Sequence, residues 1–303
     1  ECIQTAAYGN KGRDIGMLGI SKKEKKPEEP QYYMSRVQMP VMNYKVYHMG
    51  KVEKILTFML AFVIGAAVAY LFYGGLFKDE YGNATTATWI SNIVIMLVVG
   101  IIAGRMFVPI RTKSIIDKNQ RKLKEQFRSM LEAVNTSLGA GNNAIDSFES
   151  AYRDLRVQYE EDAFILKELN VILVSNRNNI DIETVLKDFG ERSGIDDIKS
   201  FASVYEICYR KGGNLRDVIN NTHSIISDKM EIMEEIETMV ASNKMEQNLM
   251  IVMPVGLIGV IKMMSPDFGD NYATAAGVIA TTLGIVCFVA AYYVGRKILD
   301  IKL

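Results

Sequence analysis

Four apolar stretches, arranged as two close pairs, constrain this chain of 303 residues more than any other feature of its sequence. They are residues 55–77, 89–110, 249–264 and 272–295. An α-helix needs about 20 mostly apolar residues to cross roughly 30 Å of hydrocarbon, and only the stretch 249–264 is marginal in length. We therefore predict an all-α membrane protein with four transmembrane helices in two hairpins.

The basic residues beside the apolar stretches predict how these helices are oriented. Lys and Arg in short loops favour the cytoplasmic side of a membrane. The connections within the two pairs, residues 78–88 and 265–271, contain four carboxylates and a single Lys. The other flanks contain Lys51, Lys54, Arg111, Lys113, Lys118, Arg121, Lys122, Lys124, Arg296, Lys297 and Lys302. We expect both termini and the segment between the pairs to lie in the cytoplasm.

The N-terminal region, residues 1–54, is polar and basic and contains Pro27, Pro30 and Pro40. It shows no sustained helical period, which is typical of a largely flexible arm. Four tyrosines near Lys45 and Lys51 favour a second interpretation, in which the arm lies on the membrane surface. We see no signal-peptide pattern and expect the first apolar stretch to direct insertion.

The central segment, residues 111–247, is predicted to be a bundle of about six helices. It contains no proline, and its apolar residues recur at helical spacing. The clearest stripes are Leu123, Phe127, Met130, Leu131 and Val134; Ile165, Leu169, Ile172 and Leu173; and Ile198, Phe201 and Tyr205. The chain thus divides into an arm (1–54), a first transmembrane hairpin (55–110), this domain (111–247) and a second hairpin with a short tail (248–303).

Three of the predicted junctions between helices are similar to one another. They read LGAGNNAIDSF from Leu138, VSNRNNIDIETVL from Val174 and YRKGGNLRDVI from Tyr209. In each, a helix ends, an Asn or Gly run turns the chain, and an apolar residue restarts a helix. A degenerate repeat of helical hairpins and independent convergence on the same capping residues both account for this pattern.

The last helix of the central segment begins near Leu215 and meets no Gly or Pro before the apolar residues from Leu249 onward. We predict that it continues unbroken into the third span and lengthens that marginal span. Small residues also recur at intervals of four inside the spans, and such stripes let helix backbones approach closely. The glycines of these stripes, which we predict to lie in helix contacts, are Gly65, Gly100, Gly104 and Gly284.

The sequence offers no candidate catalytic, cofactor-binding or metal-binding residues. It contains no phosphate-binding Gly-x-x-x-x-Gly-Lys-Ser/Thr loop. His48 and His223 are distant in the chain and lack cysteines or paired carboxylates at ligand spacing. Acidic and basic residues are equal at 35 each, so there is no nucleic-acid footprint. We expect a protein that is not an enzyme.

The segment YEICYRKGGNLRDVI, residues 205–219, places a Gly-Gly turn between two helices, the second of which leads into a membrane span. A short Ser-Pro-Asp turn, residues 265–267, separates the last two spans. In these features residues 127–303 resemble the F-domain family of type II secretion and type IV pilus systems, and most closely the TadB-like proteins of the Tad (Flp) pilus. The secretion-system members usually have two helical repeats and three spans, whereas one such segment with four spans matches the Tad type.

The resemblance implies a platform protein of the cell (inner) membrane at the base of a pilus or secretion machine. Its implied partners are a cytoplasmic ATPase, pilin subunits, and a homologous F-domain protein or a second copy of itself. The candidate turn for an acidic partner comprises Arg210, Lys211, Gly212, Gly213, Asn214 and Arg216, although a helix cap at Gly213 also explains it. A transporter subunit and a membrane-anchored signalling adaptor with a helical cytoplasmic domain are the alternatives.

Overall fold

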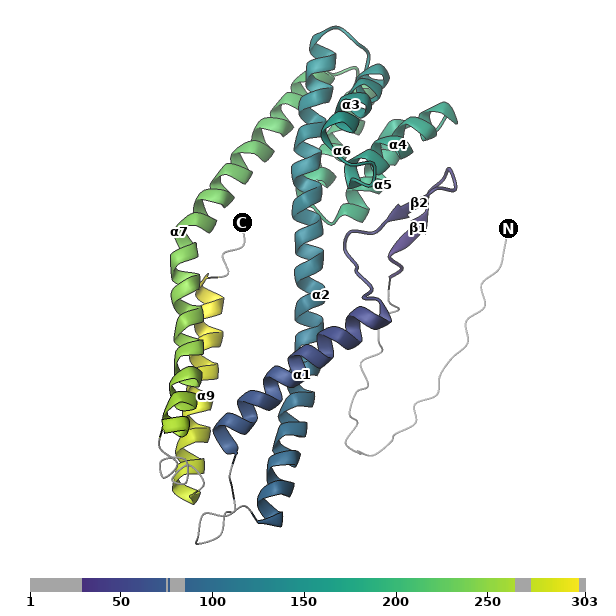
Figure 1. Cartoon of the computed structure of the whole chain (residues 1–303). Coiled ribbons are helices and arrows are strands. Elements are labelled where there is room, and N and C mark those ends of the chain that lie inside the picture. The colour runs from purple at the N-terminus through teal and green to yellow at the C-terminus, as the bar shows by residue number, and fades with distance from the viewer. Residues whose placement is uncertain (1–28, 75, 77–84, 265–273, 300–303) are drawn as a thin grey trace, which may run out of the picture.

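The computed structural model describes residues 29–74, 76, 85–264 and 274–299, and helices dominate this part of the chain (Figure 1). In chain order the elements are β1 (Tyr32–Met34), β2 (Pro40–Met42), α1 (Lys51–Tyr73), α2 (Thr86–Gly139), α3 (Ala144–Gln158), α4 (Phe164–Arg177), α5 (Ile182–Ser193), α6 (Asp196–Lys211), α7 (Leu215–Met264) and α9 (Ala275–Leu299). Apart from the antiparallel pair β1 and β2, the architecture is the predicted all-α one. The Ser-Pro-Asp turn at 265–267 and most of the connection 78–88 lie outside the described residues.

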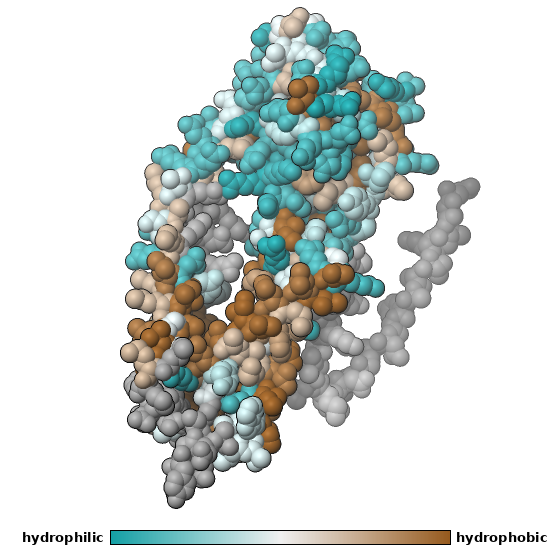
Figure 2. All heavy atoms as spheres, viewed as in Figure 1, coloured by the Kyte–Doolittle hydropathy of each residue, from teal (hydrophilic) through white to brown (hydrophobic). Residues whose placement is uncertain are grey.

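Four of the described helices contain segments long and apolar enough to cross a membrane. These segments are α1 (Lys51–Tyr73), part of α2, Ala241–Lys262 of α7 and Ala276–Gly295 of α9. Figure 2 shows that hydrophobic surface covers α1 and the parts of α2, α7 and α9 around it, whereas the opposite end of the molecule is mostly hydrophilic. The chain therefore has the helices of a multi-pass membrane protein.

Two of these helices, α2 and α7, join an apolar span to the polar part of the molecule without a break. They contain 54 and 50 residues, so at about 1.5 Å per residue each is roughly 75–80 Å long. The prediction that the helix starting near Leu215 continues into the third span is confirmed. The boundary that we placed at residue 110 falls inside α2, and this helix continues through Pro109 into the bundle.

The polar end of the molecule is a helical bundle made of α3 to α6, the C-terminal part of α2 and the N-terminal part of α7. Its six helices agree with the predicted number. Phe127 lies at the centre, with its ring centroid 5.4 Å from that of Phe201 and 6.1 Å from that of Phe189. The predicted apolar stripes are buried in this core: Leu123, Phe127, Met130, Leu131, Val134, Ile165, Leu169, Ile172, Leu173, Ile198, Phe201 and Tyr205.

Residues 29–50 differ from the flexible arm that we predicted. β1 pairs with β2, with Tyr32 opposite Met42, and Val41 and Tyr44 are buried in the core of the bundle. Tyr44 therefore does not lie on a membrane surface. Strands of three residues are too short to show the alternation that predicts a strand, and the burial of Tyr44 depends on residues more than a hundred positions away. Residues 1–28 lie outside the described part of the chain.

Candidate functional site

The directions of the helices bring the three similar junctions to one end of the bundle. α2, α4 and α6 end there, and α3, α5 and α7 begin there, so residues 139–143, 178–181 and 211–214 form what we call the tip. Ion pairs join neighbouring helix ends: Arg177 Nη2 lies 3.9 Å from Glu149 Oε1, and Arg210 Nε lies 3.7 Å from Glu183 Oε1. The tip lies at the end of α2 opposite its apolar span (Figure 1).

The backbone conformation and packing of the turn at 211–214 explain why glycine occupies positions 212 and 213. Gly212 ends α6 in the left-handed conformation at φ 71°, which glycine adopts most readily. The Gly213 amide donates a hydrogen bond of 2.8 Å to the Cys208 carbonyl oxygen. A Cβ at Gly213 would lie 2.9 Å from Cys208 Sγ, so a side chain there would require Cys208 to shift. The turn is therefore a helix cap, but its left-handed residue is Gly212 and not Gly213, where we had placed the cap.

Asparagine caps two of the three junctions in the same way. The Asn214 Nδ2 group donates to Asp217 Oδ2 at 2.7 Å, and its Oδ1 accepts a hydrogen bond from the Arg216 amide. At the start of α3, the Asn143 Nδ2 group donates to Asp146 Oδ2, also at 2.7 Å. An Asn followed three residues later by Asp is the shared sequence signal.

The third junction uses different chemistry, so the similarity of the junctions is only partial. Asn179 takes a left-handed φ of 54°, and the Ile180 amide donates to the Ser175 carbonyl oxygen at 2.9 Å. Asp181 precedes α5 but forms no side-chain capping bond. Repeat ancestry and convergent capping both remain compatible with these three turns.

The three basic residues of the candidate turn have different surroundings in the structure. Arg210 is engaged with Glu183 and with Glu206, whose carboxylate lies 3.4 Å from its Nη2. The Arg216 guanidinium lies over Gly139 at the end of α2, where a Cβ would be 3.3 Å from its Nη2. A cation at this position is stabilised by the helix dipole of α2. Lys211 is exposed and forms no ion pair among the described residues, so it is the basic side chain most available to a partner.

The glycines of the first two spans lie where α1 crosses α2 (Figure 1). A Cβ at Gly65 would lie 2.7 Å from the Ala103 Cβ. Cβ atoms at Gly100 and Gly104 would lie 2.7 Å and 2.6 Å from the rings of Phe62 and Phe58. The absence of side chains at these glycines lets two phenylalanine rings of α1 lie on the α2 backbone.

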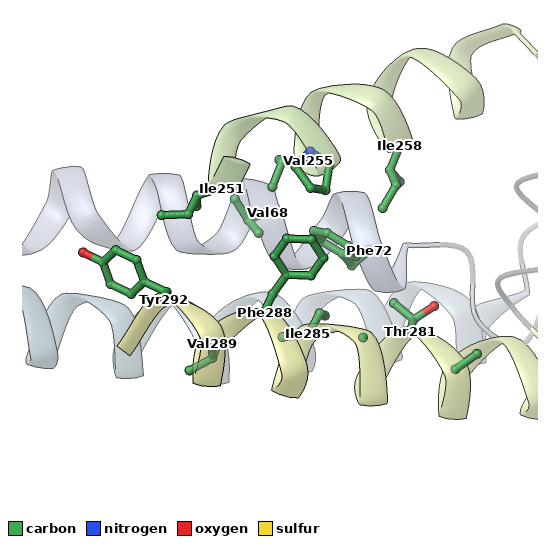
Figure 3. A pocket seen from close by; sticks show the side chains of 13 residues that line it. Val68, Phe72, Ile251, Val255, Ile258, Thr281, Ile285, Phe288, Val289 and Tyr292 are labelled. Carbon is green, nitrogen blue, oxygen red and sulfur yellow. The ribbon is translucent and has the colours of Figure 1, made fainter. Parts of the chain in front are cut away.

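Gly284 of α9 has different surroundings, since a Cβ there would meet no atom within 4 Å. It lines an apolar cavity of about 580 Å³ between α1, α7 and α9 (Figure 3). The side chains of Phe72, Ile258 and Phe288 line the same cavity. The structure therefore brings Gly65, Gly100 and Gly104 together and leaves Gly284 apart.

A buried ion pair that our sequence reasoning missed joins α4 to α5. Arg192 donates from Nη1 to Glu168 Oε1 at 2.9 Å and from Nη2 to Glu168 Oε2 at 2.8 Å. The hydroxyl of Tyr44 donates to the same carboxylate at 2.9 Å. Burial and the nearby negative charge of Glu168 raise the pKa of Tyr44. The available signal was the position of Glu168 among the apolar residues of a predicted stripe, where a charge requires a partner.

A second missed group, Asp197, links the two long helices. Its carboxylate forms an ion pair with Lys124 of α2 at 3.0 Å and another with Lys229 of α7. Burial raises the pKa of Asp197, but the hydrogen bonds and charges of the two lysines outweigh burial, so its pKa lies below the ordinary value. Beside it, a cavity of about 220 Å³ lies between α2 and α7, lined by Gln120 and Met233 among others.

The described residues contain no group of three or more His, Cys, Asp or Glu side chains that could hold a metal ion. Comparisons of this chain with models of protein families, with curated proteins and with solved structures found no match.

Proposed function

We propose that this chain is an integral-membrane platform protein of a type IV (Tad/Flp) pilus or type II secretion machine, which couples a cytoplasmic ATPase to the assembly of pilin subunits. In this proposal α1 with α2 and α7 with α9 form two membrane hairpins in the cell membrane. The basic flanks of the spans favour a bundle in the cytoplasm, beside the energy source.

The observation that carries the proposal is the continuity of α2 and α7. Each is a single helix that begins or ends in the bundle and includes an apolar span. Ile219, Ile226 and Met230 of α7 are buried in the same core as Leu123 and Phe127 of α2. Packed cores resist deformation, so a force on the bundle moves both helices together, and the helices carry that movement into the membrane. This is the mechanical property that a platform between a motor and membrane subunits requires.

The tip is the surface that we assign to the motor in this proposal. It is the end of the bundle opposite the span of α2, and its turns expose Lys211, Gly212 and Asn214. Arg210 and Arg216 already have contacts within the chain. We therefore assign the electrostatic contribution to ATPase binding to Lys211 alone. A rim charge of this kind contributes roughly 1 kcal/mol and affects the rate of association most.

Detergent copurification with the secretion ATPase encoded in the same genome tests the proposal. The wild-type chain is expected to recover the ATPase, and Lys211→Glu is expected to reduce that recovery about fivefold, equivalent to roughly 1 kcal/mol. Lys167→Glu is the matched control, because Lys167 is an exposed lysine of the same bundle near the start of α4, away from the tip.

Failure of the wild-type chain to recover the ATPase would count against the platform function. Recovery that is equal for wild type and Lys211→Glu would leave the function standing but reject Lys211 as the contact.

A further inference from the structure

Residues 43–50 connect β2 to the first turn of α1, and their first part is fixed in the bundle. Tyr44 is only 2% exposed, and its ring packs edge-on against Phe164 with the centroids 5.3 Å apart. Its amide donates a hydrogen bond of 3.0 Å to the carbonyl oxygen of Arg192, and its hydroxyl donates to Glu168 Oε1 at 2.9 Å. A backbone bond, a side-chain bond and an aromatic contact thus hold the same residue.

The ion pair beneath Tyr44 depends on this segment for part of its hydrogen bonding. The side chains of Arg192 and Glu168 are only 6% and 3% exposed. Arg192 Nη1 donates to the Met42 carbonyl oxygen at 2.8 Å, in addition to its bonds to Glu168. Buried charges are stable only when their remaining hydrogen-bonding groups are satisfied. The segment around Tyr44 therefore completes the environment of a buried pair that belongs to α4 and α5.

The loop between α5 and α6 forms the rest of the surface on which residues 44–45 pack, which we call the seat. Gly194 has a left-handed φ of 67°, and a Cβ at this position would lie 2.6 Å from Lys45 Cγ. The Gln120 side chain of α2 donates to the Ser193 carbonyl oxygen at 3.0 Å, which fixes this loop to the long helix. The chain at residues 44–45 therefore lies against a surface that is itself attached to α2.

The second part of the segment is fixed to α1. The Tyr47 hydroxyl donates to Glu53 Oε2 in the first turn of α1 at 2.9 Å, and the Lys54 amide donates to the Gly50 carbonyl oxygen. Six residues lie between Tyr44 and Lys51, so the connection spans at most about 25 Å at roughly 3.5 Å per residue. Both ends are attached and the length between them is short.

We propose that residues 43–53 act as a strap, a short segment that couples α1 to the bundle. Tyr44 is the residue that attaches the strap to the bundle. The strap is a third mechanical connection, separate from the continuous helices α2 and α7. Movement of the bundle relative to α1 pulls on the start of α1 through Tyr44 and Tyr47. The existence of the strap is independent of the proposed function, and only its use in transmitting force from an ATPase rests on that function.

Hydrogen–deuterium exchange on the full chain in lipid nanodiscs tests the strap. Tyr44→Ala is expected to raise amide exchange at residues 44–53 at least tenfold, and to raise exchange in α4 and α5 much less, because these helices lose one hydrogen bond to Glu168 and one aromatic contact. Tyr44→Phe retains the ring and loses only the hydroxyl bond, so a smaller rise of about threefold is expected. Tyr32→Ala is the matched control, since Tyr32 is 59% exposed and its loss leaves the seat of Tyr44 intact.

A second measurement reports on coupling directly. Val52 of α1 and Val157 of the bundle are exposed. Each is replaced by a spin-labelled cysteine in a chain whose three native cysteines are changed to serine. The distribution of distances between them is expected to broaden in Tyr44→Ala and to stay unchanged in Tyr32→Ala.

Two results would overturn the strap. One is a wild-type result in both measurements: Tyr44→Ala and Tyr44→Phe show the wild-type amide exchange at residues 44–53 and the wild-type distance distribution. The other is an equal loss of protection in α4 and α5, which would make Tyr44 an ordinary core residue. Neither result involves the ATPase, and recovery of the ATPase by Tyr44→Phe is expected to equal wild type because the tip is unchanged.

Discussion

Gly65 of α1 and Ala103 of α2 lie so close together that a Cβ at Gly65 would be 2.7 Å from the Ala103 Cβ. The backbones of the two helices therefore meet where neither carries a large side chain. Between helices in a membrane, close packing replaces the hydrophobic effect as the source of association, and small residues at the contact permit it. The contact between α1 and α2 is consequently sensitive to any increase in volume at Gly65.

Replacing Gly65 by leucine is expected to separate α1 from α2 and to lower the free energy of unfolding by about 1–3 kcal/mol, the usual effect of overpacking. The thermal midpoint of the detergent-solubilised chain measures this change. Gly284→Leu is the matched control, because a Cβ at Gly284 meets no atom within 4 Å, and a change below about 0.5 kcal/mol is expected. Equal destabilisation by the two variants would contradict the role assigned to Gly65.

Asp197 is expected to hold α2 and α7 together in a manner that depends on pH. Its pKa in the folded protein lies below the ordinary carboxyl value of about 3.9, because the lysines Lys124 and Lys229 stabilise the charged form. A lowered folded pKa gives stability that is present above the unfolded pKa and is lost as pH falls through the folded value. Asp197→Asn is therefore expected to lower stability by about 1–2 kcal/mol at pH 7.

The difference between wild type and Asp197→Asn should shrink below about pH 4, where wild-type Asp197 begins to take up its proton. Thermal midpoints of both chains at neutral and acidic pH measure this. A difference that stays constant across the range would show that the charge of Asp197 is not what joins the two helices.

Much of the bundle follows from the sequence because its physical causes are local. The stripe from Leu123 to Val134 recurs at helical spacing, and the absence of Gly and Pro between Leu215 and Leu249 predicted the long helix α7 correctly. The same argument would not have predicted the continuity of α2, because Pro109 lies inside that helix near the end of the apolar run. There the end of the apolar run was taken as a boundary, although a change in polarity alone does not end a helix.

The parts that the sequence did not predict depend on contacts between distant residues. Tyr44 lies in a segment with short strands and no helical period, and its burial requires Glu168 and Arg192 from two other helices. Arg210 and Arg216 were grouped as available charges, but the fold places acidic partners beside one and the end of α2 beneath the other. Neither arrangement is visible from spacing along the chain.

Breaking the buried ion pair is expected to be among the most damaging single changes. Arg192→Met leaves the carboxylate of Glu168 buried without its cation, and a loss of about 3–5 kcal/mol is expected from the uncompensated charge. Chemical denaturation of the purified chain measures it. Arg156→Met removes the cation of an exposed Arg–Glu pair instead, and a loss below about 1 kcal/mol is expected. Similar losses in the two variants would contradict the dominance of burial.

The orientation of the chain in the membrane is testable by single-cysteine labelling. With the native cysteines replaced, a cysteine at Gln158 at the end of α3 is expected to stay protected from an impermeant reagent in intact cells, because the basic flanks of the spans favour a cytoplasmic bundle. Cysteines at Tyr81 and Gly269, in the acidic connections within each pair of spans, are expected to react. Labelling at Gln158 in intact cells would contradict this orientation. So would protection of both Tyr81 and Gly269 in intact cells that is lost after lysis. Either result would remove the bundle from the reach of a cytoplasmic ATPase.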